Sequence, residues 1–183
     1  MVCDPPPLEL TSDDVVVVCD PIEAYAALFT PFKVRAIARL MALAAEAKAP
    51  VIVTRWARVD ASGGDAVDAK GHWSNYVPTG TNYVMRDLTG AMALAAATVV
   101  PVKFTNAFAH PEVLRRTTGK RRLVVAGAWA ESCVLQTAHA ALEHDMCPVV
   151  VTSATAGHAF ASFYALMQVV LCIGEVARVD VPL

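Results

Sequence analysis

The sequence has few charges and no long apolar run, and both shortages limit what kind of protein it is. Of its 183 residues, 17% are charged and 56% are hydrophobic, which is too apolar a composition for a disordered chain. No apolar run reaches the roughly 18–20 residues that cross a bilayer. The first residues, MVCDPPPLEL, contain acids and three prolines where a secretory signal carries basic and then apolar residues. We therefore expect neither a membrane partner nor secretion.

A basic stripe is also missing, and the formal net charge is −2. The nearest approach to a basic cluster lies between residues 115 and 122, where it is typical of a solvated helix end and turn. Nucleic acid is therefore not an expected partner. The five cysteines (Cys3, Cys19, Cys133, Cys147 and Cys172) form an odd set without disulfide or metal spacing. Reduced thiols and a cytoplasmic location follow as the simplest expectation.

Short β-branched runs are present instead, and a helical pattern follows each of them. The runs predict six strands, at residues 15–19, 51–54, 98–102, 123–127, 147–152 and 175–181. The helical patterns cover residues 32–49, 86–97, 111–117, the segment after Cys133 and 158–172. Strands that are apolar throughout and alternate with helices indicate a parallel sheet covered on both faces.

The predicted fold class is therefore α/β, a three-layer α/β/α sandwich with a six-stranded, mainly parallel sheet. We see no internal repeat and no domain boundary, so we expect a single domain over residues 1–183, with residues 1–13 as an N-terminal extension. The high apolar content also favours a buried subunit interface, and hence a homo-oligomer.

Three reactive side chains follow predicted strands, at the edge where ligands bind in such sheets. They are Asp20, Lys103 and Cys133. Each has a plainer interpretation: Asp-Pro opens turns, a loop lysine is solvated, and a free cysteine is an inert core residue. Together, however, a thiol at a helix N-terminus, an ammonium and a carboxylate suffice for acyl transfer through a thioester.

At this point the sequence resembles the isochorismatase-like cysteine hydrolases. The resemblance is carried by Asp20 after the first strand, by Lys103 in VVPVKFTNAF, and most specifically by LVVAGAWAESCVLQTAHAALEHDMCPVVVTSATA. It implies that Cys133 attacks a carbonyl carbon, that Asp20 moves the proton, and that Lys103 keeps Asp20 ionised. It also implies a cis peptide between Ala128 and Trp129, with an oxyanion hole made by the backbone N–H groups of Trp129 and Cys133.

The sequence departs from the family pattern at several positions. The opening segment reads DPIEAY, so that Ile22 stands in place of the usual glutamine and Tyr25 in place of phenylalanine. Ala130 and Ser153 replace a threonine and an aspartate. The metal-binding Asp-x-His pair of nicotinamidases has no counterpart in VTRWARVD, and His72 stands alone. We therefore expect no metal and no other cofactor.

The residues expected to contact a small-molecule substrate are aromatic. Tyr25, Phe108 and Trp129 match family pocket positions, and Trp73 or Tyr76 is placed to close over the site. The plainer interpretation leaves Phe108 in the core and Trp73 at a subunit contact. Such a pocket suits a small apolar or planar amide, and Arg55 and Arg86 are weak candidates for recognising a carboxylate.

The leading hypothesis is a hydrolase acting on carbon–nitrogen bonds other than peptide bonds, with a small amide or carbamoyl-type substrate and an Asp-Lys-Cys triad. Three alternatives stay open. One is a non-catalytic or regulatory member of the family, favoured by the altered DPIEAY segment. Another is an isochorismatase-type enol-ether hydrolase, although such enzymes generally lack the cysteine. The third is a redox-sensing thiol protein.

Overall fold

Six parallel strands form the centre of the computed structural model, which describes residues 5–60, 77–78 and 80–181. The strand order is β5-β2-β1-β6-β7-β8. The strands are β1 (Asp14–Cys19), β2 (Val51–Trp56), β5 (Thr98–Val102), β6 (Arg122–Ala128), β7 (Cys147–Ala156) and β8 (Glu175–Ala177). A separate parallel pair joins β3 (Val59–Asp60) to β4 (Val77–Pro78).

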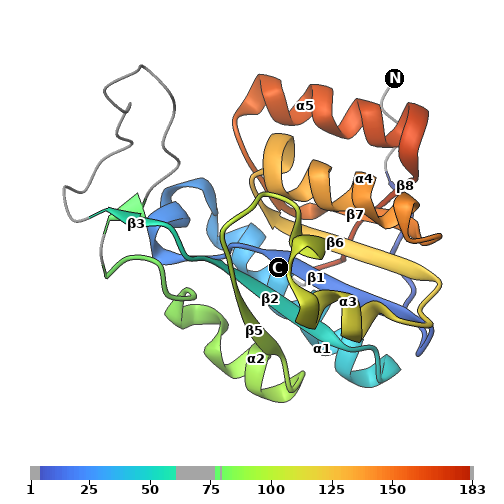
Figure 1. The fold of residues 1–183 in the computed structure, drawn as a ribbon, viewed down its shortest axis with the longest axis horizontal. Coiled ribbons are helices and arrows are strands. Elements are labelled where there is room, and N and C mark those ends of the chain that lie inside the picture. The colour runs from blue at the N-terminus through green and yellow to red at the C-terminus, as the bar shows by residue number, and fades with distance from the viewer. Residues whose placement is uncertain (1–4, 61–76, 79, 182–183) are drawn as a thin grey trace.

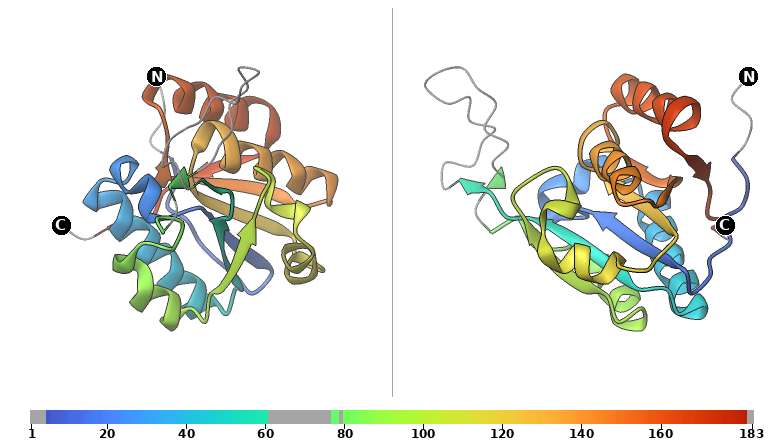
Figure 2. Two further views of the ribbon diagram at one scale, coloured as in Figure 1. Left: turned by 60° about the vertical axis from the view of Figure 1, so that its left-hand side comes forward. Right: turned by 45° about the vertical axis from the view of Figure 1, so that its right-hand side comes forward.

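Helices cover both faces of the sheet (Figure 1). On one face lie α1 (Pro31–Ala47) and α2 (Thr89–Leu94), and on the other lie α3 (Pro111–Thr117), α4 (Leu135–Glu143) and α5 (Ala159–Gln168). Short turns of helix connect them: η1 (Glu23–Leu28), η2 (Arg86–Leu88), η3 (Ala107–Ala109), η4 (Ala130–Val134) and η5 (Val169–Ile173). The predicted three-layer α/β fold is confirmed, and the side views in Figure 2 show the two helical layers.

The order of strands explains why β1 is so apolar. β1 and β6 are the two central strands, and valines of β1 pack alternately into the two cores on either side of the sheet. Val16 and Val18 join the core beneath α1, whereas Val15 and Val17 join the core beneath α4. Because every residue of β1 is buried, the strand has no polar face.

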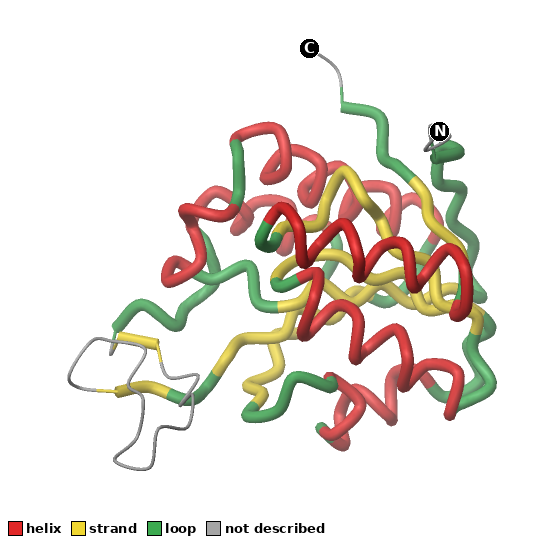
Figure 3. The backbone as a smooth tube through the Cα atoms, turned by 90° about the horizontal axis from the view of Figure 1, so that it is seen from above, coloured by secondary structure: helices red, strands yellow, loops and turns green. Residues whose placement is uncertain are grey.

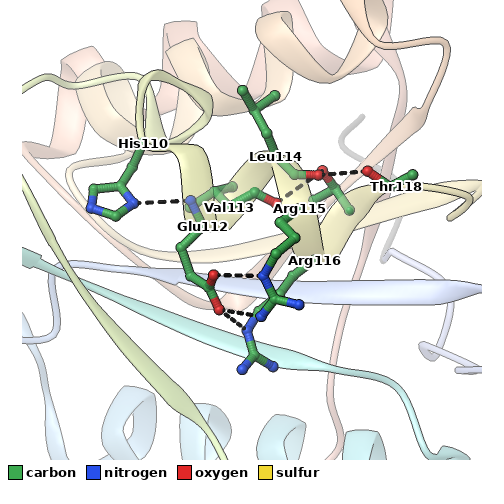
Figure 4. Close-up of polar contacts among 8 residues, drawn as sticks. His110, Glu112, Val113, Leu114, Arg115, Arg116 and Thr118 are labelled. Atoms are coloured by element: carbon green, nitrogen blue, oxygen red, sulfur yellow. Dashed lines mark hydrogen bonds and ion pairs between the residues drawn. The ribbon is translucent and has the colours of Figure 1, made fainter.

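The ends of α1 follow from local chemistry. The Thr30 hydroxyl accepts a hydrogen bond from the Lys33 backbone N–H, Pro31 occupies the first turn, and Lys48 ends the helix in a left-handed conformation. In α3 the His110 ring caps the helix by accepting from the Glu112 backbone N–H (Figure 4).

Several predicted boundaries are wrong. The pattern at residues 86–97 gives two consecutive short pieces, η2 and α2, and the left-handed backbone at Ala96 prevents α2 from continuing to residue 97. β7 runs on to Ala156, four residues beyond the prediction, whereas β8 is only three residues long. In the part of the chain that the structure describes, no helix is long and apolar enough to cross a membrane.

One close approach aligns the two central strands at their carboxyl ends. Cys19 lies opposite Gly127 in the parallel register, and Gly127 has a positive φ of 102°. A Cβ on Gly127 would lie 2.0 Å from the Cys19 carbonyl oxygen. Only glycine fits here, so this residue lets the ends of β1 and β6 come together. Figure 3 shows the strands from above.

We expect Gly127→Ala to lower the free energy of unfolding by about 3 kcal/mol or more, because the methyl group meets backbone atoms and the φ is unfavourable. Gly90→Ala in α2 is the control, since its Cβ meets nothing within 4 Å. That change is expected to be neutral or stabilising by up to about 1 kcal/mol. Urea titration of both variants measures the difference, and equal stabilities would contradict the account.

Candidate active site

The carboxyl ends of β1, β2 and β6 bring a carboxylate, a hydroxyl and a thiol together. Asp20 follows β1 directly, Thr54 lies in β2, and Cys133 lies in η4 after β6. Asp20 is 1% exposed and Cys133 is 6% exposed. Residues that are far apart in the chain therefore meet at the edge of the sheet where ligands bind in parallel α/β folds.

Thr54 fixes the orientation of Asp20. Its hydroxyl donates to Asp20 Oδ1 at 2.8 Å and accepts from the Asp20 backbone N–H at 3.0 Å. Asp20 itself has a positive φ of 42°, which turns its side chain away from the strand. Asp20 Oδ2 is buried and has no hydrogen-bond partner of normal geometry among the described residues. One carboxylate oxygen is thus held and the other is open.

Burial raises the pKa of Asp20 from 3.8 to about 6. The Thr54 hydroxyl, the Cys133 thiol and the Trp56 backbone N–H each act in the opposite direction. The carboxyl group is therefore poised to change its protonation state slightly below neutral pH. That range suits a group that takes up and returns a proton.

The Cys133 thiol is next to this carboxyl group. Burial raises the pKa of Cys133 well above its usual value, and the Asp20 carboxylate raises it further. The Trp129 backbone N–H and the Ser132 side chain act to lower it. At neutral pH the pair therefore consists of a neutral thiol beside an ionised carboxylate, which can accept the thiol proton.

The backbone between β6 and Cys133 has an unusual path. The Ala128–Trp129 peptide bond is cis, at the position that the family resemblance indicates. The Trp129 carbonyl then accepts from the backbone N–H groups of Ser132 and Val134, which forms a tight turn. The Trp129 backbone N–H lies next to the Cys133 sulfur.

Lys103 differs from the expectation. Its side chain is exposed, and it lines a hollow of about 280 Å³ with Phe104, Asn106 and His110. Among the described residues no hydrogen bond or ion pair joins it to Asp20, and it does not contribute to the pKa of Asp20 or Cys133. Phe104, the next residue, is 61% exposed. The structure therefore brings together two of the three predicted reactive groups.

The predicted pocket residues have different environments. Tyr25 and Trp129 are half-buried and in edge-to-face contact, with their ring centres 5.4 Å apart. Phe108 is 4% exposed, as its plainer interpretation as a core residue has it, and its ring stacks on that of the exposed His144. Trp73, Tyr76 and His72 lie outside the described residues.

Two features of the site were not predicted from the sequence. Thr54 ends a predicted strand at the edge where ligands bind, but its hydrogen bond to Asp20 crosses between neighbouring strands and has no signal in the sequence. His158 begins a predicted helix, and its ring lies 4.6 Å from that of Trp129. Glu131 supports this corner, because its carboxylate accepts from the His158 backbone N–H at 3.0 Å and from the Ser162 hydroxyl at 3.1 Å. Among the described residues no cluster of His, Cys, Asp and Glu could hold a metal ion.

Comparison with known families agrees with this geometry. The model of the isochorismatase domain matches residues 15–180. The chain belongs to the isochorismatase family. This family match covers every strand of the central sheet except the first residue of β1. No curated protein sequence matches the chain.

Solved structures of isochorismatase-like proteins share the fold. The nicotinamidase PncA of Bacillus subtilis is 19% identical with a TM-score of 0.73, over 90% of this chain and 99% of that one. N-carbamoylsarcosine amidase of Thermoplasma acidophilum is 18% identical with a TM-score of 0.69, over 92% and 98%. The YcaC gene product of Escherichia coli, described as an octameric hydrolase of unknown specificity, is 21% identical with a TM-score of 0.68, over 94% and 79%.

The raised pKa of Asp20 predicts how the stability of this isochorismatase domain depends on pH. Between pH 4 and pH 6 the folded state holds a proton that the unfolded state has lost, so the free energy of unfolding falls as pH rises. Asp20→Asn removes this decrease in the free energy of unfolding, because asparagine has no carboxyl group to ionise. We expect the variant to be more stable than the wild type at pH 7.5, by up to about 3 kcal/mol, and to lose this advantage at pH 4.

The control for this prediction is Asp14→Asn. Burial acts to raise the pKa of Asp14, but hydrogen bonds from Arg122 and Thr11 outweigh it and lower the pKa. This variant is therefore expected to be less stable than the wild type at pH 7.5. Urea unfolding across the pH range measures both, and an Asp20→Asn effect that is independent of pH would contradict the assignment.

Proposed function

We propose that the protein is a cysteine amidohydrolase that cleaves a C–N bond of a small amide or carbamoyl-type substrate through a thioester on Cys133. The single observation that supports it most is the pairing of the buried Asp20 carboxyl with the Cys133 thiol beside the Trp129 N–H. The amidases among the structural neighbours have the same fold and support the choice of a C–N bond.

In the first half of the reaction the sulfur attacks the carbonyl carbon while Asp20 takes the thiol proton. The carbonyl oxygen becomes an oxyanion and accepts hydrogen bonds from the backbone N–H groups of Trp129 and Cys133. As the intermediate collapses, the C–N bond breaks and Asp20 returns the proton to the leaving nitrogen. Ammonia or an amine departs, and the acyl group remains on Cys133.

In the second half a water molecule attacks the thioester. Asp20, again ionised, takes a proton from this water, and the same backbone N–H groups hold the oxyanion. The C–S bond then breaks, and the sulfur regains a proton from Asp20 as the acid product leaves. One carboxyl group thus acts as base and acid in turn, which fits a pKa of about 6.

Lys103 is assigned the role that the family resemblance implies, which is to keep Asp20 ionised. Its exposed position is the observation that favours the second candidate function, a non-catalytic member of the family. In that case the buried, protonated thiol of Cys133 is a core residue and turns nothing over.

Ammonia release from a panel of small amides and carbamoyl compounds tests the proposal. We expect Cys133→Ser to lower kcat by at least about a thousandfold, because a buried serine hydroxyl beside a carboxylate is a far poorer nucleophile. Cys19→Ser, which changes the neighbouring buried thiol, is the control and is expected to retain turnover. Unchanged turnover in Cys133→Ser would overturn the mechanism.

We also propose that the protein is a homo-oligomer. Helix α5 exposes Phe160 and Tyr164, 84% and 68% accessible, on one face of a helix that has no charged residue. The octameric YcaC product is a neighbour in fold. Light scattering after size exclusion is expected to give a multiple of 19.4 kDa, and a monomer at micromolar concentration would contradict this part.

A further inference from the structure

Lys33 lies in the first turn of α1, at the same edge of the sheet as the reactive pair. Its side chain is half-buried, and its ammonium group donates to the Thr155 carbonyl at the end of β7. This contact joins the first turn of α1 to the end of β7. It leaves two of the three ammonium N–H donors without a described protein partner.

Three features of its surroundings disfavour the charged form of this ammonium group. Burial lowers the pKa of Lys33, which means that the charged form is disfavoured where it lies. The first turn of a helix is the positive end of its dipole, and α1 has no acidic residue there. No Asp or Glu among the described residues lies within ion-pair distance of it. A half-buried ammonium group without an acidic partner among the described residues can take up an anion from outside the chain.

The β6–β7 register connects Lys33 to the reaction centre. Thr155 lies opposite Gly127, and Ala156 lies opposite Ala128. Continuing along each strand leads to His158 on one side and Trp129 on the other, whose rings are 4.6 Å apart. The backbone N–H of this same Trp129 reaches the Cys133 sulfur. The ammonium therefore lies near the end of β6, close to the backbone that leads through Trp129 to Cys133.

Tyr25 completes the connection. Its ring contacts Trp129 edge-on, and it packs against both hydrophobic cores, so it lies at the boundary between the nucleophile's side of the sheet and the α1 side. The acidic residue near Trp129 and His158 is Glu131, and both of its carboxylate oxygens already accept hydrogen bonds. It is therefore not the counter-ion of Lys33.

We propose that Lys33 binds a carboxylate at the end of the substrate opposite the cleaved C–N bond, with the body of the substrate against Trp129 and Tyr25. This inference rests on the proposed function and narrows it: the natural substrates are amides or carbamoyl compounds that carry a carboxylate. The weaker sequence candidates do not serve this role. Arg55 lines a separate hollow with Tyr83, Met92 and Val99, beside β5 and α2.

A matched series of amides tests the proposal. Malonamate, succinamate and glutaramate each carry a terminal carboxylate, and propanamide, butanamide and pentanamide have a methyl group in its place. We expect the wild type to prefer the carboxylated member of at least one pair by roughly 10- to 100-fold in kcat/KM, the effect of one charge-assisted hydrogen bond. The chain length that it prefers reports the span from Cys133 to Lys33.

Lys33→Met is expected to abolish this preference by raising KM for the carboxylated amide, with little change for the neutral one. Lys33→Arg, which keeps the charge, is expected to retain most of it. Lys48→Met is the matched control, since Lys48 is exposed at the other end of the same helix, and it is expected to behave as the wild type. If Lys33→Met lowers kcat/KM equally for both members of a pair, Lys33 serves only to hold α1 against β7 through its hydrogen bond to Thr155. The proposal is then overturned.

A binding measurement separates this proposal from the proposed function. Calorimetric titration of Cys133→Ser with the same six amides is expected to show tighter binding of the carboxylated member, lost in Cys133→Ser/Lys33→Met. Turnover without any carboxylate preference overturns the Lys33 site and leaves the amidohydrolase standing. Carboxylate-dependent binding without turnover of any amide by the wild type overturns the amidohydrolase and leaves the Lys33 site standing.

Discussion

The burial of one carboxyl group against one thiol is the constraint on which the rest of the site depends. Taking Asp20 out of water raises its pKa to about 6, and the same burial keeps the Cys133 thiol protonated. Because neither group is well solvated, the Asp20 carboxylate is the group that can accept the Cys133 thiol proton, and the sulfur is the group to which it can return that proton. The fold gives up stability at neutral pH to hold an ionised carboxylate in this place, as is common where a site serves chemistry.

The parallel sheet makes this pairing possible. Its central strands end side by side, so that the residue after β1 and the turn after β6 reach the same point. Gly127 allows the backbones of β1 and β6 to approach each other, and Thr54 on β2 fixes the orientation of the Asp20 carboxyl group. The reactive atoms thus lie on a rigid edge, whereas Lys103 lies on the loop that follows β5 and is exposed to solvent.

The fold could be predicted from the sequence because its strands are buried on both faces. Runs such as VVVVC and LVVAG have no polar alternation, and this leaves a parallel sheet between helices as the natural solution. Asp20 and Cys133 could be predicted as partners because strand ends in such sheets share one edge. Their closeness required only the correct order of strands.

Other parts of the site depend on contacts that no local pattern contains. The hydrogen bonds of Thr54 to Asp20 join residues 34 positions apart. The stacking of Phe108 on His144 removes from the pocket a residue that its sequence position had placed there. Lys103 was predicted beside Asp20 and Cys133, but it lies on a loop where both it and Phe104 are exposed to solvent. The cation that is half-buried at this edge, Lys33, lies in an ordinary helical pattern and has no motif.

The ionisation of Asp20 is the most direct test of the central pairing. A carbon-13 NMR titration of its labelled carboxyl group is predicted to give a midpoint near 6 in the wild type. The midpoint is predicted to move upward in Cys133→Ala and in Thr54→Val, because each removes a side chain that lowers the pKa of Asp20. A midpoint near 3.8 that neither substitution moves would mean that Asp20 is solvated and apart from the thiol, and the account of the site would be wrong.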